Sequence, residues 1–547
     1  MWYLNDKKKI FILIFVVHLL FLREGLFSND EGAHYLLTRS LAENFPDFLD
    51  LSQYISMPAG KGPYYSFFKY GDEVHAGVNL GLPALSSPFY LLFGRFGIKI
   101  FNLLAGLITS YAIFLAASRL YGRRHALLAA MLYVFVTPSL FYSTSLWNHA
   151  LTTLLFTLTI YIFLAYEDRS RDAVLFSLLA ALTVLSSYYM IVPVSLLCVT
   201  FALRLRSTQR IACLACYLLF LLPAFAFNYF NFGSPLLGEY SVPGVSTGGS
   251  ASPAADGAER LLKGLAALLI SVDVSDHYYS FSQKAVFQSS PVLVLSLLYI
   301  LRSRRLLAVS ASCLLLILMV AYHDGDFGGW QLSMRYVLPV FPFLTISFAG
   351  FLHRSGIEYE LRRLSAALLF LAILALAFPF SPRSEEYLLI KIFSAFLALF
   401  LLLSSPVLER LNTGHVKNFV FLLIMFSALV NLNDAGYGAS YRSAHAFIEE
   451  SLEGAHDVVL FPADAPFAGL FMPDKLTVQY RSPGEIVRYL GHGNLTVISE
   501  DAPPAEGCAS TSRSFGSAYA YLVREKRLRE LLNVVEKYRI INLHCKS

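Results

Sequence analysis

Apolar runs of membrane-spanning length recur along most of this chain, and they constrain its fold more than any motif does. A transmembrane helix needs about 20 mostly apolar residues, with a range of about 17 to 25. Such runs, three of them short, lie at 10–27, 98–118, 125–142, 149–166, 173–187, 189–204, 211–229, 289–301, 305–322, 336–352, 363–380, 386–405 and 417–432. The sequence therefore predicts a mainly α, polytopic transmembrane helix bundle of about thirteen spans, a count that the three short runs could change by one or two.

Composition agrees with this class. Of the 547 residues, 56% are hydrophobic and only 15% are charged, whereas about 25% of a soluble domain is charged. The net charge of +5 is small, and no basic stripe with interleaved aromatic residues occurs. Membrane topology explains the basic residues better than nucleic-acid binding does.

Basic residues accumulate in short cytoplasmic loops, so they predict the orientation. They fall on one side of the predicted membrane at Lys7, Lys8, Lys9, Arg119, Arg123, Arg124, Arg204, Arg206, Arg210, Arg302, Arg304, Arg305, Arg354, Arg362, Arg363, Arg410 and Lys417. This pattern predicts a multi-pass protein of the cell membrane with a cytoplasmic N-terminus. An odd number of spans places the C-terminal region outside, together with loops 23–97 and 230–288. Counting 82–96 as a further span would reverse the pattern, so we expect an in-plane or re-entrant helix there.

The composition changes after residue 432, where charged and turn-forming residues return. Segments 457–461 and 495–499 are typical of buried strands, and 525–538 has helical spacing. We therefore expect two domains, a transmembrane domain at 1–432 and a small extracytoplasmic α/β domain at 433–547. Cys508 and Cys545 both lie in the second domain, where a disulfide is chemically permitted, although the sequence does not give their separation.

The first external loop begins with an acidic motif, Ser28-Asn29-Asp30-Glu31-Gly32-Ala33-His34-Tyr35. Ser28 and Glu31 have the spacing of a helix capping box, and acids in a first helical turn suit the helix dipole. Asp30 and His34 are four residues apart and share a helix face, as do Glu31 and Tyr35. The motif has two interpretations: a helix cap, or a carboxylate backed by an imidazole that acts as a base, as a metal site or as a clamp for the acceptor.

These residues resemble the opening of GT-C glycosyltransferases, in particular the polyprenyl-phosphate-sugar users related to lipid A aminoarabinose transferase and protein O-mannosyltransferase. The resemblance rests on Asp30-Glu31-x-x-His34-Tyr35, Leu36-Leu37-x-x-Ser40-Leu41-Ala42, Gly81-Leu82-Pro83 to Leu92-Phe93-Gly94, Asn228 to Pro235, and Gly328-Gly329-Trp330 to Arg335-Tyr336-Val337-Leu338-Pro339. It covers most of the membrane part. It implies a GT-C bundle and an inverting transfer in which Asp30 is the catalytic base, with its neighbour Glu31 as the second catalytic residue.

The departing lipid phosphate needs cations or oriented dipoles. Arg335 lies at an external helix end, against the positive-inside trend, and is the main candidate; an interfacial anchor is the alternative. The remaining residues expected to bind substrate are His34, Tyr35, Lys61, Lys69, His75, His149 and Tyr336. Lys61 and Lys69 also have a simpler interpretation, as solvated loop charges.

The family often carries a second acid between spans three and four, but this chain has Ser145-Leu146-Trp147-Asn148-His149 there. His149 is either a hydrogen-bonding group or part of an interfacial anchor with Trp147. Asp324 and Asp326 in another outer loop are candidates for the missing acid. The scheme requires no cofactor, and it leaves a divalent metal open without predicting one.

The expected function is therefore transfer of a monosaccharide from a polyprenyl-phosphate donor to an acceptor hydroxyl on a lipid, glycan or protein, at the outer membrane face. The expected partners are these substrates and membrane lipids, with no nucleic acid. The competing interpretation is a transporter or lipid-linked sugar flippase, which should show internal repeats and ionisable residues near span centres. A receptor or assembly role for the C-terminal domain ranks last, because anchoring does not require so many spans.

Overall fold

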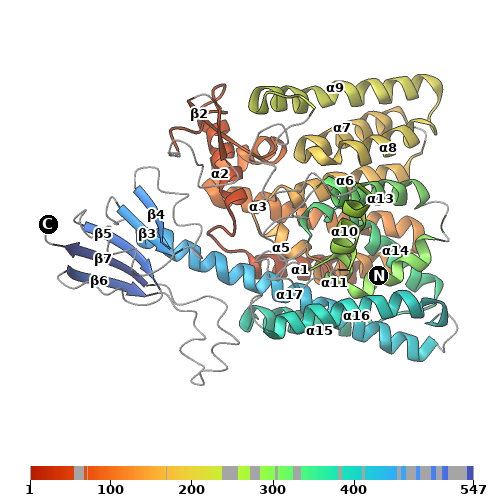
Figure 1. Cartoon of the computed structure of the whole chain (residues 1–547). Helices are drawn as coiled ribbons and strands as arrows, with labels where there is room; N and C mark the ends of the chain where they lie inside the picture. Colours follow the sequence, from red (N-terminus) through yellow and green to blue (C-terminus); the bar gives the residue numbers. More distant parts are fainter. Residues whose placement is uncertain are drawn as a thin grey trace.

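The computed structural model describes residues 2–54, 67–70, 72–167, 169–236, 257–270, 284–301, 303, 306–323, 334–379, 385–408, 413–452, 458–462, 476–480, 494–499, 508–514 and 539–545. Helices dominate (Figure 1). They are α1 (Trp2–Phe21), α2 (Asn29–Glu43), α3 (Gly81–Tyr121), α4 (Arg123–Val136), α5 (Ser139–Ser143), α6 (His149–Ala165), α7 (Ser170–Ser186), η1 (Tyr188–Met190), α8 (Ile191–Ala202), α9 (Ser207–Phe232), α10 (Gly257–Leu269), α11 (Val286–Ser289), η3 (Pro291–Leu295), α12 (Ser296–Ile300), α13 (Leu307–His323), η5 (Arg335–Val337), α14 (Val340–Arg354), α15 (Leu361–Ala377), α16 (Glu385–Leu408) and α17 (Thr413–Leu452).

Each predicted span coincides with a helical segment, although some boundaries move. Helix α1 ends at Phe21, earlier than the predicted residue 27, because the chain turns there towards α2. Helix α17 continues beyond 432 to Leu452, so it crosses the expected domain boundary. By length and composition, Gly81–Tyr121, Ser207–Phe232 and Gly414–Ser443 are suited to cross a membrane, and shorter apolar helices accompany them. The helices are confirmed, while the number of crossings stays a prediction.

The apolar stretch at 82–96 forms the first part of α3 and is separated from the rest by a break at Gly94. Gly94 has φ 60° and ψ −147°, a conformation that glycine adopts without the steric cost of a Cβ atom. A Cβ atom on nearby Gly97 would lie 2.0 Å from the carbonyl oxygen of Phe89, so the chain bends tightly here. Leu91, Leu92 and Phe93 are exposed beside the break, as suits a segment that faces lipid.

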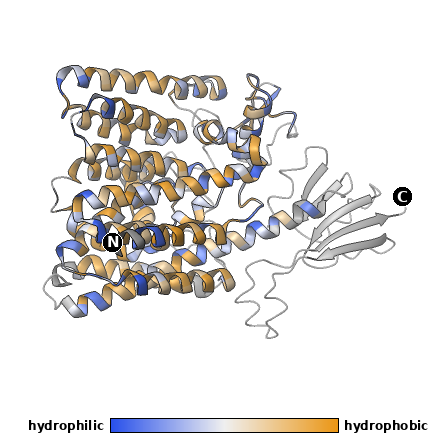
Figure 2. Ribbon diagram, turned by 180° about the vertical axis from the view of Figure 1, so that it is seen from behind, coloured by the Kyte–Doolittle hydropathy of each residue, from blue (hydrophilic) through white to orange (hydrophobic). Residues whose placement is uncertain are grey.

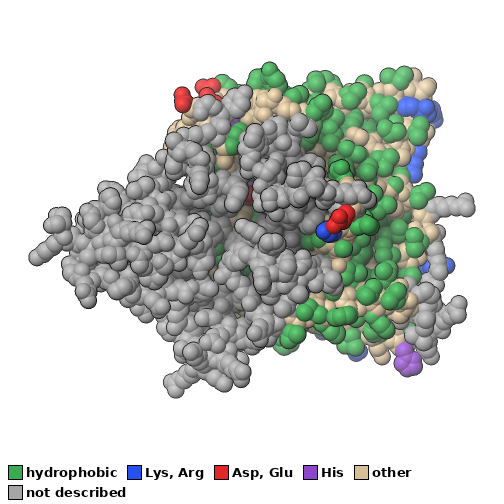
Figure 3. Space-filling model, viewed as in Figure 1, with side chains coloured by type: hydrophobic (Ala, Val, Ile, Leu, Met, Phe, Trp, Pro, Cys, Tyr) green, Lys and Arg blue, Asp and Glu red, His purple; other side chains and the backbone are tan. Residues whose placement is uncertain are grey.

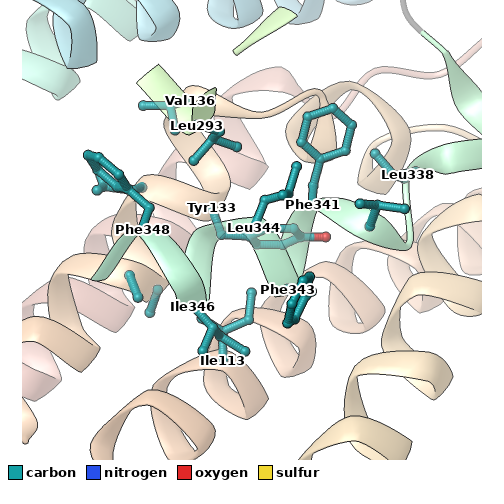
Figure 4. Close-up of a cluster of buried hydrophobic side chains, with 14 of the residues drawn as sticks. Ile113, Tyr133, Val136, Leu293, Leu338, Phe341, Phe343, Leu344, Ile346 and Phe348 are labelled. Carbon is teal, nitrogen blue, oxygen red and sulfur yellow. The ribbon is translucent and has the colours of Figure 1, made fainter. Parts of the chain in front are cut away.

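The main hydrophobic core runs through the middle of the bundle. Every residue of α14 from Val340 to Leu352 is buried, as is nearly all of α4. Figure 4 shows Phe341, Leu344 and Phe348 of α14 among side chains of neighbouring helices. Most of the helical ribbon is coloured as hydrophobic (Figure 2), and large apolar side chains such as Leu219, Phe396 and Leu403 are exposed, which is the pattern of a bundle that sits in lipid.

The first external loop has a hydrophobic core of its own, which fixes it to the end of α9. Strands β1 (Phe67–Tyr70) and β2 (Glu73–Ala76) pair antiparallel. Their buried residues pack with α2 and with Phe227 and Phe232 of α9. Helix α9 ends at Gly233, which is left-handed at φ 71°, as the helix-breaking Gly-Ser-Pro sequence predicts. This second core holds α2 at the end of the bundle.

The C-terminal region contains a five-stranded sheet in the order β4-β3-β5-β7-β6. The strands are β3 (Val458–Pro462), β4 (Leu476–Tyr480), β5 (Asn494–Ser499), β6 (Cys508–Ser514) and β7 (Arg539–Cys545). Strand β3 is parallel to β4 and β5, and β7 is antiparallel to β5 and β6. Both strands expected from the sequence are confirmed, while the helix expected at 525–538 lies outside the described residues.

Helix α2 and the C-terminal sheet lie at the same end of the bundle in Figure 1. In Figure 3, hydrophobic side chains cover most of the described face of the bundle, and several Lys and Arg side chains appear at its right-hand edge. The separation of the acidic motif from the basic loops stays a prediction.

Candidate active site

Asp30 forms an ion pair with Arg335, although 305 positions separate them in the sequence. Asp30 lies in the first turn of α2, and Arg335 begins η5. The side chain of Asp30 is 31% exposed and that of Arg335 is 12% exposed. The fold therefore brings the two leading candidates from the sequence together, at a site where the carboxylate remains accessible.

The local sequence explains why Asp30 is held there. Ser28 is the N-cap of α2, and its hydroxyl accepts a hydrogen bond from the backbone N–H of Glu31, at 3.4 Å. This hydrogen bond confirms the Ser28 half of the expected capping box. Glu31 accepts from the backbone N–H of Phe27, at 3.0 Å, rather than from that of Ser28. The cap fixes the first helical turn, which also favours the negative charge of Asp30 through the helix dipole.

His34 lies one helical turn after Asp30 and is buried. Burial lowers the pKa of His34 to about 4; the charge of Asp30 opposes this shift and that of Arg335 adds to it. The ring is therefore neutral at neutral pH. Its Nδ1 atom has no hydrogen-bond partner within the described part of the chain. A neutral imidazole with a free nitrogen beside a carboxylate is able to bind a hydroxyl group.

Aromatic rings complete the surroundings of Arg335. Its Nη2 atom donates to the hydroxyl of Tyr336 at 3.1 Å, and its guanidinium lies 4.9 Å from the centre of the same ring. The ring of Tyr336 packs edge-on against His149, with 5.7 Å between ring centres. His149 also meets Tyr142, at 5.6 Å. Asp30, His34, His149, Arg335 and Tyr336 thus surround one site.

Other residues expected at the site have different neighbours. Tyr35 lies 6.2 Å from Tyr90 between ring centres, and the guanidinium of Arg95 lies 5.8 Å from the ring of Tyr35. His75 is buried in β2, with Nδ1 3.0 Å from Asn231 Oδ1 and Nε2 3.0 Å from Glu73 Oε2. It therefore joins the β1–β2 hairpin to the end of α9.

Four further candidates remain. Lys69 lies in β1, opposite Val74. Lys61, Asp324 and Asp326 lie outside the described residues. Across the described ranges no group of three or more His, Cys, Asp and Glu side chains is arranged to hold a metal ion.

The sequence did not point to Arg442. This residue of α17 is fully buried, and its Nη2 atom lies 3.5 Å from Glu31 Oε1. Arg335 stands out in the sequence as a cation at an external helix end, whereas Arg442 lies within α17, ten residues before its end. Arg442 also follows residue 432, in the part of the sequence expected to form the soluble domain.

Comparison with known proteins agrees with the fold. The family model for dolichyl-phosphate-mannose-protein mannosyltransferase matches residues 82–229. No curated protein sequence matches the chain significantly. The chain has the fold of the GT-C membrane glycosyltransferases, which confirms the resemblance inferred from its sequence.

More particularly, the chain is similar in structure to ArnT from Cupriavidus metallidurans. The apo structure of ArnT is 12% identical, with a TM-score of 0.52, and the match covers 99% of this chain and 97% of ArnT. ArnT bound to undecaprenyl phosphate gives 12% identity and a TM-score of 0.52, with 100% and 98% covered. The oligosaccharyltransferase of Archaeoglobus fulgidus is 13% identical over 91% of this chain and 69% of that one, with a TM-score of 0.48.

Proposed function

We propose that this protein is an inverting glycosyltransferase that moves a monosaccharide from a polyprenyl-phosphate donor to an acceptor hydroxyl at the outer membrane face. The ion pair between Asp30 and Arg335 is the observation that carries the proposal. It brings a base and a phosphate-binding cation into contact in a chain with the GT-C fold. The undecaprenyl phosphate in one ArnT structure supports a polyprenyl-phosphate carrier.

In this mechanism the carboxylate of Asp30 takes the proton of the acceptor hydroxyl. The acceptor oxygen then attacks the anomeric carbon from the face opposite the phosphate, and the bond between that carbon and the phosphate oxygen breaks. General-base help of this kind is worth about 10²–10⁴ in rate. The lipid phosphate leaves with the electron pair, and Arg335 stabilises its charge.

The ion pair suggests an order of events. Without substrate, Arg335 neutralises Asp30. A donor phosphate competes for the same guanidinium, because arginine binds phosphate and carboxylate with the same planar arrangement of N–H groups. Donor binding then releases the carboxylate to act as a base. Tyr336 keeps the guanidinium in place through its hydroxyl.

The rings of His34 and His149 have the role of binding substrate hydroxyls. Both carry a buried Nδ1 atom without a partner among the described residues, and a buried polar atom is normally hydrogen-bonded. A sugar or acceptor hydroxyl in the site is a suitable partner for each.

The test is sugar transfer by the purified protein in nanodiscs, with a panel of radiolabelled polyprenyl-phosphate sugars and a membrane extract as acceptor. Asp30→Asn should lose transfer by about 10²-fold or more while unfolding at a similar temperature. Glu43→Gln is the matched control, since it removes a carboxylate at the other end of α2, where Glu43 binds Arg39, Tyr54 and Tyr90. Full transfer by Asp30→Asn would show that the base is assigned wrongly. No transfer from any donor by folded protein would favour the transporter interpretation.

A further inference from the structure

Both oxygens of the Glu31 carboxylate are bound by the protein itself. Oε2 accepts from the backbone N–H of Phe27 at 3.0 Å, and Oε1 lies 3.5 Å from Nη2 of Arg442. Neither side chain of this ion pair has any exposed surface. Asp30, its neighbour in sequence, is partly exposed and pairs with Arg335. Two adjacent carboxylates therefore have different environments, one open and one enclosed.

Arg442 joins three segments of the chain. Its guanidinium lies 5.8 Å from the ring centre of Phe27, before α2, and 5.1 Å from that of Phe141, in α5. Its Nη1 atom lies 3.5 Å from the hydroxyl oxygen of Thr144. One buried cation of α17 thus contacts both the start of α2 and the segment that leads towards His149.

The backbone of the same region makes a second contact with α17. Gly25 has φ +78°, and a Cβ atom built on it would lie 2.1 Å from the carbonyl oxygen of Arg442 and 2.8 Å from the nitrogen of Ala446. The loop before α2 therefore touches α17 through its main chain. Buried Lys99 donates to the carbonyl oxygens of Gly25 and Arg23 and so also holds this loop.

We propose that the Glu31–Arg442 ion pair positions Asp30, so that Glu31 is a positioning residue and not a second catalytic acid. This inference rests on the proposed function, in which Asp30 is the base. Glu31 and Asp30 share the first turn of α2, so a rotation of that turn displaces the Asp30 carboxylate relative to Arg335. Through Arg442, the position of α17 then determines where the base lies.

The experiment compares Glu31→Gln, Arg442→Gln and the double variant, with kcat and KM for the donor measured per folded protein. Each single change leaves a buried charge without its partner and should lower kcat by about 10²-fold, because a small displacement of a catalytic group has an effect of that size. KM should stay within about threefold, because Arg335 still binds the phosphate. The double variant has no unpaired charge and two amides able to hydrogen-bond, so it should recover at least about tenfold in kcat over either single variant.

If Glu31 were itself a catalytic residue, the result would differ, because adding Arg442→Gln to the Glu31→Gln variant could not restore its kcat. A double variant no faster than that single variant overturns the proposal. If a single variant does not fold, Arg442→Lys keeps the charge and should fold with a lower kcat and an unchanged KM. An unchanged kcat for Arg442→Lys likewise overturns it.

The matched control is Asp434→Asn. Asp434 lies on α17, like Arg442, and forms an equally buried ion pair with Lys284. Asp434 lies eight positions before Arg442 on α17, a distance of about 12 Å along the axis. This control should lower the unfolding temperature and leave kcat per folded protein unchanged. Absence of transfer by the wild-type protein would mean that the proposed function has failed, whereas transfer without recovery in the double variant would mean that only the positioning role has failed.

Discussion

Arg335 binds Asp30 and Tyr336 through different guanidinium nitrogens. Arg335→Gln removes the charge that a donor phosphate needs, so KM for the donor should rise by about 10- to 100-fold. Arg335→Lys keeps the charge but lacks the planar set of donors, and should have an intermediate KM. Steady-state kinetics with varied donor concentration measure both values.

The control for Arg335 is Arg39→Gln, which removes a cation from the exposed pair between Arg39 and Glu43 on α2. Exposed pairs contribute about 1 kcal/mol or less, and this variant should keep its KM. An Arg335→Gln variant with the wild-type KM would mean that the phosphate is bound elsewhere.

His34 gives the protein a pH dependence whose sign follows from its environment. Burial holds the pKa of His34 at about 4 in the folded protein, below the unfolded value of about 6.5. The unfolded state therefore binds a proton first as the pH falls. The stability from neutral His34 is complete above about pH 6.5 and is lost between about pH 6.5 and 4, with a loss of about 2–3 kcal/mol by pH 4.5.

Thermal unfolding in detergent at pH 7.5 and pH 4.5 measures this effect. The unfolding temperature of the wild-type protein should be lower at pH 4.5 than at pH 7.5. His34→Gln, which cannot titrate at this position, should show a smaller decrease. Equal falls in both proteins would assign the acid sensitivity to other groups.

At the residue level, the sequence predicted the participants at the site better than their contacts. The resemblance to GT-C enzymes indicates Asp30, and a cation outside against the positive-inside trend indicates Arg335; the structure brings the two together. Their pairing could not be predicted, because it depends on how α2 and η5 pack across 305 positions. Glu31 was placed beside Asp30, but its partner Arg442 is 411 positions away.

At the level of elements, the contact between the loop before α2 and α17 depends on Gly25. Gly25→Ala adds a Cβ atom 2.1 Å from the carbonyl oxygen of Arg442 and forces a side chain into a positive φ. We expect a loss of more than about 2 kcal/mol of stability, with a fall in kcat from the displaced Asp30.

Gly356→Ala separates the cost of a positive φ from the cost of the close approach to α17. Gly356 has φ +62° and no atom within 4 Å of a built Cβ, so its substitution costs only the backbone strain of about 1–2 kcal/mol. Unfolding temperature and kcat should be measured for both variants. A Gly25→Ala protein that matches Gly356→Ala in both would show that the close approach to α17 is not needed.

Hydrophobic length predicted where helices form, but not where they end. The first span ends at Phe21 rather than 27, because Ser28 caps a new helix. The last span continues beyond 432 because polar residues there are buried within the protein: Asp434 pairs with Lys284, and Arg442 pairs with Glu31. Hydropathy treats such residues as signs of a water-exposed segment, although partners inside the protein permit them to be buried.

At the level of the whole molecule, the shared position of α2 and the C-terminal sheet (Figure 1) makes the predicted outer location of both testable by one experiment. Cys508 and Cys545 face one another in the register of β6 and β7. Opposite residues of antiparallel strands have Cα atoms about 4.5–5.5 Å apart, within the range of about 4.4–6.8 Å for disulfides. An oxidising outer compartment should therefore join them.

Labelling of intact cells or spheroplasts with a membrane-impermeant maleimide tests this prediction. The variant that keeps only Cys508 and Cys545, with alanine at the other four cysteines, should resist the reagent until an impermeant reductant is added, and should then be labelled without permeabilisation. A Cys508→Ala version should be labelled at Cys545 without reduction. Labelling that requires permeabilisation would place the C-terminal sheet inside the cell, and with it the ion pair of Asp30 and Arg335 at the same end of the bundle. An outer-face transfer reaction would then be wrong, even if the residues of the site were assigned correctly.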